Sequence, residues 1–230
     1  RDFEKRFSLL TLGNYAWIIR NLFNLYHKQE WEWFAPEMHE KLDKKLFNSL
    51  DNLVQERNEI GHYQVNLSAE EIEKRCIQYE EQLTFLLQSM AFLTKYKLVS
   101  VRDISVIKSK IKQATFHHVV DLLNSSDSDF KAKELIEDTY AESHSVLLMR
   151  NIKQMDEYLN LSPLIIDTHS EKLDSKEKFS IKKDIFLYSK FREGQVFYSG
   201  TEVTEKVDLR PLSHYQNIVE EYQGLIHALS

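Results

Sequence analysis

The sequence predicts an α+β protein whose N-terminal half is helical and whose C-terminal half is rich in strands. Apolar residues recur at three- and four-residue steps as far as about Leu98, which is the period of amphipathic helices. Beyond this point apolar and polar residues alternate, as at Val99 and Val101, which is the period of strands. We therefore expect two domains: a helical one over residues 1–98, and a small antiparallel-sheet domain with a C-terminal helix over residues 99–230.

Three long helices account for the N-terminal half. The first is predicted over residues 8–28 and the second over residues 37–60, because Pro36 favours a helix start. Between them, residues 31–34 (WEWF) either close one end of the bundle or offer rings on which bases can stack. Ser68 and Glu71 form a capping box that starts the third helix. Its apolar stripe can pack on the other helices or on a second copy of the protein: Ile72, Cys76, Tyr79, Leu83, Leu86, Met90 and Leu93.

The C-terminal half is divided into short strands by polar turns. Strand patterns cover residues 99–106, 116–123, 145–149, 164–166, 185–188 and 195–198. Residues 131–139 are predicted to form a short helix, and a longer one begins near Ser213.

Composition excludes several classes of protein. The 230 residues carry a formal net charge of −6, so any contact with RNA must come from a local cluster of cations. A single cysteine, Cys76, excludes an internal disulfide and fits a reducing, cytoplasmic compartment. No apolar run is long enough to span a membrane, and no signal-peptide pattern is present. Because residue 1 is Arg, we expect the chain to be part of a longer protein.

The end of the predicted second helix combines a cation, an amide, a glycine and an imidazole. Arg57 continues the apolar stripe that includes Leu53 and Val54. On an unbroken helix, His62 lies about 500° further round, roughly 140° from the Arg57 position. Gly61 is predicted to end the helix and to turn the chain, which brings His62 beside Arg57 and Asn58. An Arg and a His held together can bind a phosphate and transfer protons near neutral pH.

Arg57-Asn58 followed by three residues and His62 resembles the Arg-Asn-x-x-x-His motif of the HEPN (higher eukaryotes and prokaryotes nucleotide-binding) family. The resemblance covers about residues 8–97 and includes residues 10–15 (LTLGNY) at the start of the first long helix. It implies a small helical bundle that acts as a metal-independent ribonuclease in toxin or phage-defence systems. It further implies a homodimer in which two motifs share one cleft, with RNA as the substrate and no cofactor.

The resemblance also suggests a role for each residue. His62 acts as general base or acid, Arg57 stabilises the phosphoryl charge, and Asn58 orients the histidine or holds the phosphate. Tyr63 stands where the family most often has glycine, and it either narrows access to the site or stacks on a base. Arg20 and His27 form a looser second pair on one face of the first helix, which competes for the catalytic role or meets the motif across the bundle.

A non-catalytic alternative stays open. Arg57 then pairs with Glu56, Glu59 or a carboxylate of the third helix, and His62 only caps a helix end. The helical domain is in that case a dimerisation or sensing module of a larger defence or signalling protein, bound to a regulatory partner or joined to further domains.

Other chemistry has weaker support. The sequence has no phosphate-binding loop, dinucleotide fingerprint or nucleophile elbow. His117 and His118 are adjacent on a predicted strand and face opposite sides, which favours structural or surface roles. No fourth ligand accompanies Asp167, His169 and Glu171, so no metal site is predicted there. A last group of cations either touches phosphates or protects a strand edge: Lys108, Lys110 and Lys112.

Overall fold

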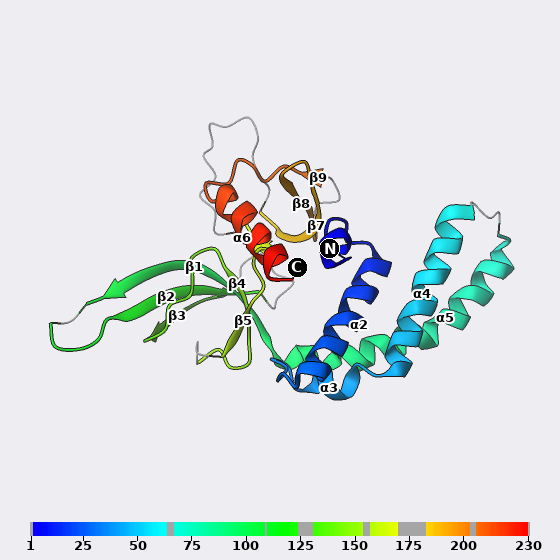
Figure 1. Cartoon of the computed structure of the whole chain (residues 1–230), viewed down its shortest axis with the longest axis horizontal. Helices are drawn as coiled ribbons and strands as arrows, with labels where there is room; N and C mark the ends of the chain where they lie inside the picture. The colour runs from blue at the N-terminus through cyan, green and yellow to red at the C-terminus, as the bar shows by residue number, and fades with distance from the viewer. Residues whose placement is uncertain are drawn as a thin grey trace. The chain divides into compact units, whose positions relative to one another are not determined.

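A computed structural model describes residues 2–63, 67–108, 110–123, 131–153, 157–169, 183–202 and 206–229. These residues combine helices with antiparallel sheets, so the protein belongs to the α+β class (Figure 1). The chain divides into a helical unit, Leu10–Thr94, and a sheet unit made of Arg1–Leu9 and Lys95–Ser230. The division near residue 95 lies close to the predicted one, but the first nine residues belong to the sheet unit.

Local capping signals decide where the helices begin. The helical unit contains α2 (Leu12–Gln29), α3 (Glu37–Lys41), α4 (Lys44–Tyr63), α5 (Ala69–Met90) and the short 3-10 helix η1 (Ala91–Lys95). Thr11 Oγ1 accepts a hydrogen bond from the Asn14 N–H (3.2 Å), so α2 begins after Thr11 and not at residue 8. The predicted capping box is confirmed, because Ser68 and Glu71 satisfy each other's backbone N–H groups.

The predicted continuous helix over residues 37–60 is wrong, because Asp43 starts a new helix inside it. Asp43 Oδ1 accepts a hydrogen bond from the Leu46 N–H at 2.7 Å, which is the geometry of a helix N-cap. The chain therefore forms the short α3 and then α4, which continues to Tyr63.

The core of the helical unit lies where α2, α3 and α5 meet the first turns of α4. Leu42, Leu46 and Phe47 are buried there, and Phe23, Trp33 and several residues of α5 pack against them. Trp33 also stacks on Tyr26 with ring centroids 4.2 Å apart, so it closes one end of the unit. Of the two roles predicted for residues 31–34, Trp33 therefore has the structural one.

The apolar stripe of α5 is divided between two environments. Leu86 and Met90 pack against the buried residues of α4. Ile72 and Leu83 are each half exposed, and Cys76 is exposed as well. Leu87, which extends the stripe, has 65% of its surface exposed. Within the described part of the helical unit, about half of the predicted stripe is thus left exposed.

The sheet unit contains two antiparallel sheets where one was predicted. The first has the order β3-β2-β1-β4-β5 and the second the order β6-β7-β8-β9. The strands of the first sheet are β1 (Lys97–Ile107), β2 (Thr115–Leu122), β3 (Lys131–Glu137), β4 (Val146–Met149) and β5 (Tyr158–Asn160). Those of the second are β6 (Ile165–Asp167), β7 (Ile185–Arg192), β8 (Gln195–Gly200) and β9 (Lys206–Val207).

Residues 131–137 form β3, so the short helix predicted over residues 131–139 is wrong. The strand pairs with β2 along its whole length, from Phe116 opposite Glu137 to Leu122 opposite Lys131. Hydrogen bonding to a strand already present outweighs the local helical pattern, because helix propensity differs by less than about 1 kcal/mol per residue.

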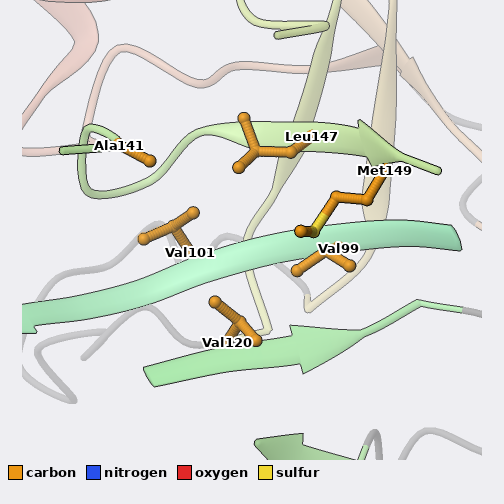
Figure 2. Close-up of a cluster of buried hydrophobic side chains, with 6 residues drawn as sticks. All are labelled: Val99, Val101, Val120, Ala141, Leu147 and Met149. Atoms are coloured by element: carbon orange, nitrogen blue, oxygen red, sulfur yellow. The ribbon is translucent and has the colours of Figure 1, made fainter. Parts of the chain in front are cut away.

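Branched and sulfur-containing side chains form the core of the first sheet. Figure 2 shows Val99 and Val101 of β1 facing Leu147 and Met149 of β4, with Val120 of β2 and Ala141 beside them. All of these valines, Leu147 and Met149 are fully buried. This cluster fixes the register of β1, since a slip of one residue turns each valine toward the opposite face.

The two ends of the sequence pack on the second sheet. In α1 (Asp2–Phe7), Phe7 is buried and its carbonyl oxygen accepts a hydrogen bond from the Tyr188 hydroxyl at 2.6 Å. The Phe191 N–H donates to the Ser8 carbonyl at 3.0 Å. In α6 (Tyr215–Ala228), the C-terminal helix that the sequence predicts, Tyr222 stacks on Phe191 with centroids 4.8 Å apart. None of the described helices is both long and apolar enough to cross a bilayer.

Candidate functional site

The helix that carries the Arg-Asn-x-x-x-His motif does not turn at Gly61. Helix α4 runs without interruption to Tyr63, so the predicted stop at Gly61 is wrong. Glycine permits the left-handed conformation but does not impose it. With the helix continuous, the positions of Arg57 and His62 diverge by about 140° around its axis. The side chains of His62 and Tyr63 lie outside the part of the chain that the structure describes.

Arg57 is exposed, and with the described residues it forms none of the ion pairs that the non-catalytic alternative requires. Among the residues that the structure describes, its side chain donates one hydrogen bond, to Asn58 Oδ1 at 3.2 Å. The neighbouring carboxylates have other partners. Glu56 pairs with Arg75 of α5 at 2.5 Å, and Glu59 accepts from the Gln55 amide at 3.0 Å. The guanidinium of Arg57 is therefore available to an anion from solution.

A polar seam separates this end of α4 from α5. It is an open hollow of about 250 Å³ lined by Asn52, Gln55, Glu56, Glu59, Gln78, Tyr79 and Gln82. Tyr79 donates to Glu56, and this hydrogen bond to a carboxylate raises the pKa of the tyrosine hydroxyl. Figure 1 shows α4 and α5 as an antiparallel pair, and this seam runs between them.

Arg20 and His27 have structural partners and do not join the motif. Arg20 forms an ion pair with Asp51 at 2.7 Å, and its guanidinium lies over the Phe47 ring. His27 stacks on Phe23 and lies near His39, at the opposite end of α2 from Thr11. Arg57 is six residues beyond Asp51, which is about 9 Å along α4. Within one chain, these residues do not converge on one site.

The paired histidines of β2 have separate roles, as alternation along a strand predicts. His118 is fully buried and its Nε2 accepts a hydrogen bond from the Ala141 N–H at 3.2 Å. Burial lowers the pKa of His118, which keeps the ring neutral. His117 is partly exposed, with Nε2 3.5 Å from Glu134.

The other sequence candidates also lie in the sheet unit. Asp167 is buried and its Oδ1 lies 2.6 Å from Nδ1 of His169, while Glu171 is outside the described residues. Lys108, Lys110 and Lys112 are exposed at the end of the β1–β2 hairpin. In the described parts of the chain, no group of three His, Cys, Asp or Glu side chains is placed to hold a metal ion.

Comparison with protein-family models, curated proteins and solved structures finds no match for this chain. The resemblance to the HEPN family therefore rests on the motif and on its place at the end of α4.

The structure adds a cavity that the sequence does not predict. It has a volume of about 440 Å³ and lies in the sheet unit, between residues 140–145, residues 162–166 and α6. The rings of His144 and His214 stack in its wall, with centroids 4.3 Å apart and planes 13° from parallel. Three carboxylates also line it, from Glu142, Glu220 and Glu221. Their sequence spacing carries no signal, because long-range folding alone brings residue 144 to residue 214.

Backbone geometry holds the two histidines in place. His144 adopts the left-handed conformation (φ 65°), and its N–H donates to the Val101 carbonyl at 2.8 Å. This bond ties the turn at residues 142–145 to β1. His214 immediately precedes α6, so Asn217, Ile218 and Glu221 follow it at three, four and seven residues on one face of the helix.

Proposed function

We propose that the chain is a metal-independent endoribonuclease of a toxin or phage-defence system, with Arg57, Asn58 and His62 as its catalytic residues. The observation that carries this proposal is the exposed Arg57 side chain, whose neighbouring carboxylates are engaged elsewhere. A guanidinium without a carboxylate partner can make a bidentate contact with a phosphate.

The proposed reaction removes one proton from the RNA and returns one proton to it. His62 removes the proton from an RNA 2′-hydroxyl, and the 2′-oxygen attacks the adjacent phosphorus. The bond from phosphorus to the 5′-oxygen breaks as that oxygen takes the proton held by His62. The products are a 2′,3′-cyclic phosphate and a 5′-hydroxyl end. Arg57 stabilises the extra negative charge on the phosphoryl oxygens as the new bond forms. Asn58 holds the phosphate, and Tyr63 stacks on a neighbouring base.

The continuous α4 helix implies that a site of this kind is shared between two chains. Because the positions of Arg57 and His62 lie about 140° apart around the axis of α4, we propose that one protomer supplies the arginine and its partner the histidine. A two-fold axis then creates two equivalent sites.

The uncovered face of α5 supports a homodimer. Ile72, Cys76, Leu83 and Leu87 fall within roughly 60° of one another around the helix, at an increment of about 100° per residue. Ile72, Leu83 and Leu87 are each half exposed or more, and Cys76 is exposed. Burial of branched aliphatic side chains stabilises association by about 25 cal/mol for each Å² of apolar surface removed from water.

The test is cleavage of RNA by the purified protein in excess chelator. We expect the wild-type protein to cleave, and Arg57→Ala and His62→Ala to lose activity by at least about 100-fold, the scale of a lost acid–base or charge-stabilising group. Arg192→Ala and His227→Ala are matched controls, because both side chains are exposed in the sheet unit. Cleavage that requires a divalent ion, or that persists in both motif variants, contradicts the proposal.

Mixing the two inactive variants tests whether the site is shared. In a mixed dimer of Arg57→Ala with His62→Ala, one shared site keeps both residues, so random exchange should restore roughly a quarter of wild-type activity. No recovery despite subunit exchange shows that each chain holds a complete site. Leu83→Lys combined with Leu87→Lys should produce a folded, inactive monomer, as measured by light scattering.

The second candidate is a dimerisation or sensing module without catalytic activity. The continuous helix favours it, because the positions of Arg57 and His62 lie about 140° apart around the axis of α4. It predicts a stable dimer that the two lysine substitutions disrupt, no cleavage of any RNA, and no effect of Arg57→Ala on dimerisation.

A further inference from the structure

The cavity of the sheet unit has a pronounced excess of negative charge. Glu142, Glu220 and Glu221 line it, and no Lys or Arg is among the described residues in its wall. The imidazole rings of His144 and His214 are 4.3 Å apart, so placing a positive charge on both is unfavourable.

The turn at residues 142–145 and the start of α6 each bring a histidine and a glutamate to this cavity. His144 from the turn stacks on His214 from the start of α6. Glu142 from the same turn acts electrostatically on Glu221 from the same helix. Partial burial, followed by the charge of Glu142, raises the pKa of the Glu221 carboxyl. Both residues are exposed at the cavity, and a cation bound between their carboxylates relieves the repulsion between them.

We propose that this cavity binds a small organic cation that carries an alkylammonium or guanidinium group. The ammonium or guanidinium lies between the carboxylates of Glu142 and Glu221. The stacked imidazoles form a flat wall for the rest of the ligand, and Asn217 and Ser143 offer further hydrogen bonds. This proposal does not depend on the proposed ribonuclease activity.

The shape and charge of the cavity exclude other classes of ligand. Phosphate and RNA are repelled by three carboxylates with no lining cation. A bare metal ion needs converging ligands, and the described side chains provide no group of three that could hold one. The volume of about 440 Å³ is far larger than an ion and falls within the range of small-molecule sites.

Calorimetric titration of the full chain with putrescine, agmatine, MgCl₂ and inorganic phosphate tests the proposal. We expect saturable binding of at least one of the two amines, and none of phosphate. Glu221→Gln and Glu142→Gln should each raise the Kd at least about 10-fold, because each removes one of two ionic contacts.

Glu134→Gln is the matched control, because it removes the same charge from an exposed position on β3. Its Kd should stay within about two-fold of the wild-type value. The proposal is overturned if neither amine binds, or if Glu134→Gln weakens binding as much as the cavity variants do. Tighter binding of Mg²⁺ than of either amine, with the same dependence on Glu221 and Glu142, also overturns it.

Discussion

At the residue scale, the two candidate sites differ in how their charges are compensated. Arg57 is exposed and contacts only the neutral Asn58 among the described residues. Glu221 is held near a second carboxylate, Glu142, and no Lys or Arg is among the described residues that line the same cavity. Both arrangements leave charge that a ligand of opposite sign can neutralise, an anion at the first and a cation at the second.

The raised pKa of Glu221 makes a prediction about stability. Because the folded protein binds this proton more tightly than the unfolded chain does, Glu221 lowers stability as the pH rises above the ordinary carboxyl value of 4.5. Glu221→Gln should therefore raise Tm at pH 7 by about 1 °C, a value that allows for solvent screening.

The same substitution should have little effect at pH 3, where the carboxyl is protonated in both states. Thermal unfolding of the wild type, Glu221→Gln and Glu134→Gln at the two pH values measures the difference. A Tm that falls at pH 7 shows that Glu221 stabilises the fold through contacts of its own.

At the element scale, the boundaries of the helices depend on single capping side chains. Ser68 could be identified as a helix cap from the sequence, because a capping box has a fixed spacing between its two residues, here Ser68 and Glu71. It starts α5 as predicted. Asp43 has the same function for α4, but Leu42 and Leu46 around it continue the helical period. Periodicity therefore predicted the apolar face correctly and missed the break within it.

Removal of this cap gives a prediction for α4. Asp43→Ala should lower the free energy of unfolding by about 1 kcal/mol, because the Leu46 N–H loses its acceptor. Asp43→Ser is the matched control and should stay within a few tenths of a kcal/mol of the wild type. Urea denaturation followed by circular dichroism measures both, and equal losses in the two variants refute a capping role.

The strands show where local pattern ceases to determine structure. Alternation located the strands that become β1, β2, β4, β6, β7 and β8. It could not assign β3, because the residues of that strand depend on pairing with β2. The cavity could not be predicted from the sequence either, because His144 and His214 are brought together only by the fold of the whole sheet unit. The motif at Arg57 could be found because its residues are neighbours in sequence. Whether the helix continues past Gly61, and so separates the positions of Arg57 and His62 around its axis, could not be predicted from the sequence.

At the scale of the whole molecule, the helical unit is an insertion within the sheet unit. Residues 1–9 precede it and residues 95–230 follow it, and both belong to the sheet unit. We therefore expect residues 10–94 to fold alone, as judged by helical circular dichroism and a cooperative thermal transition.

The sheet unit should need its N-terminal segment. Residues 1–9 joined by a flexible Gly-Ser linker to residues 95–230 should be more stable than residues 95–230 alone by about 2–3 kcal/mol, from burial of Phe7 and its hydrogen bond to Tyr188. Phe7→Ala in the linked chain should remove most of this gain. Equal stability of the two chains in urea contradicts the assignment of residues 1–9 to the sheet unit.

The bond between the Phe7 carbonyl and the Tyr188 hydroxyl joins residues 181 positions apart, which has a consequence for synthesis on the ribosome. Residues 10–94 are complete, and free to fold, before the strand that carries Tyr188 has been translated. Residues 1–9 leave the ribosome before their partners in the second sheet do. Folding of the nascent chain should therefore begin with the inserted helices, and the surrounding sheet unit should form only once the strand that carries Tyr188 has emerged.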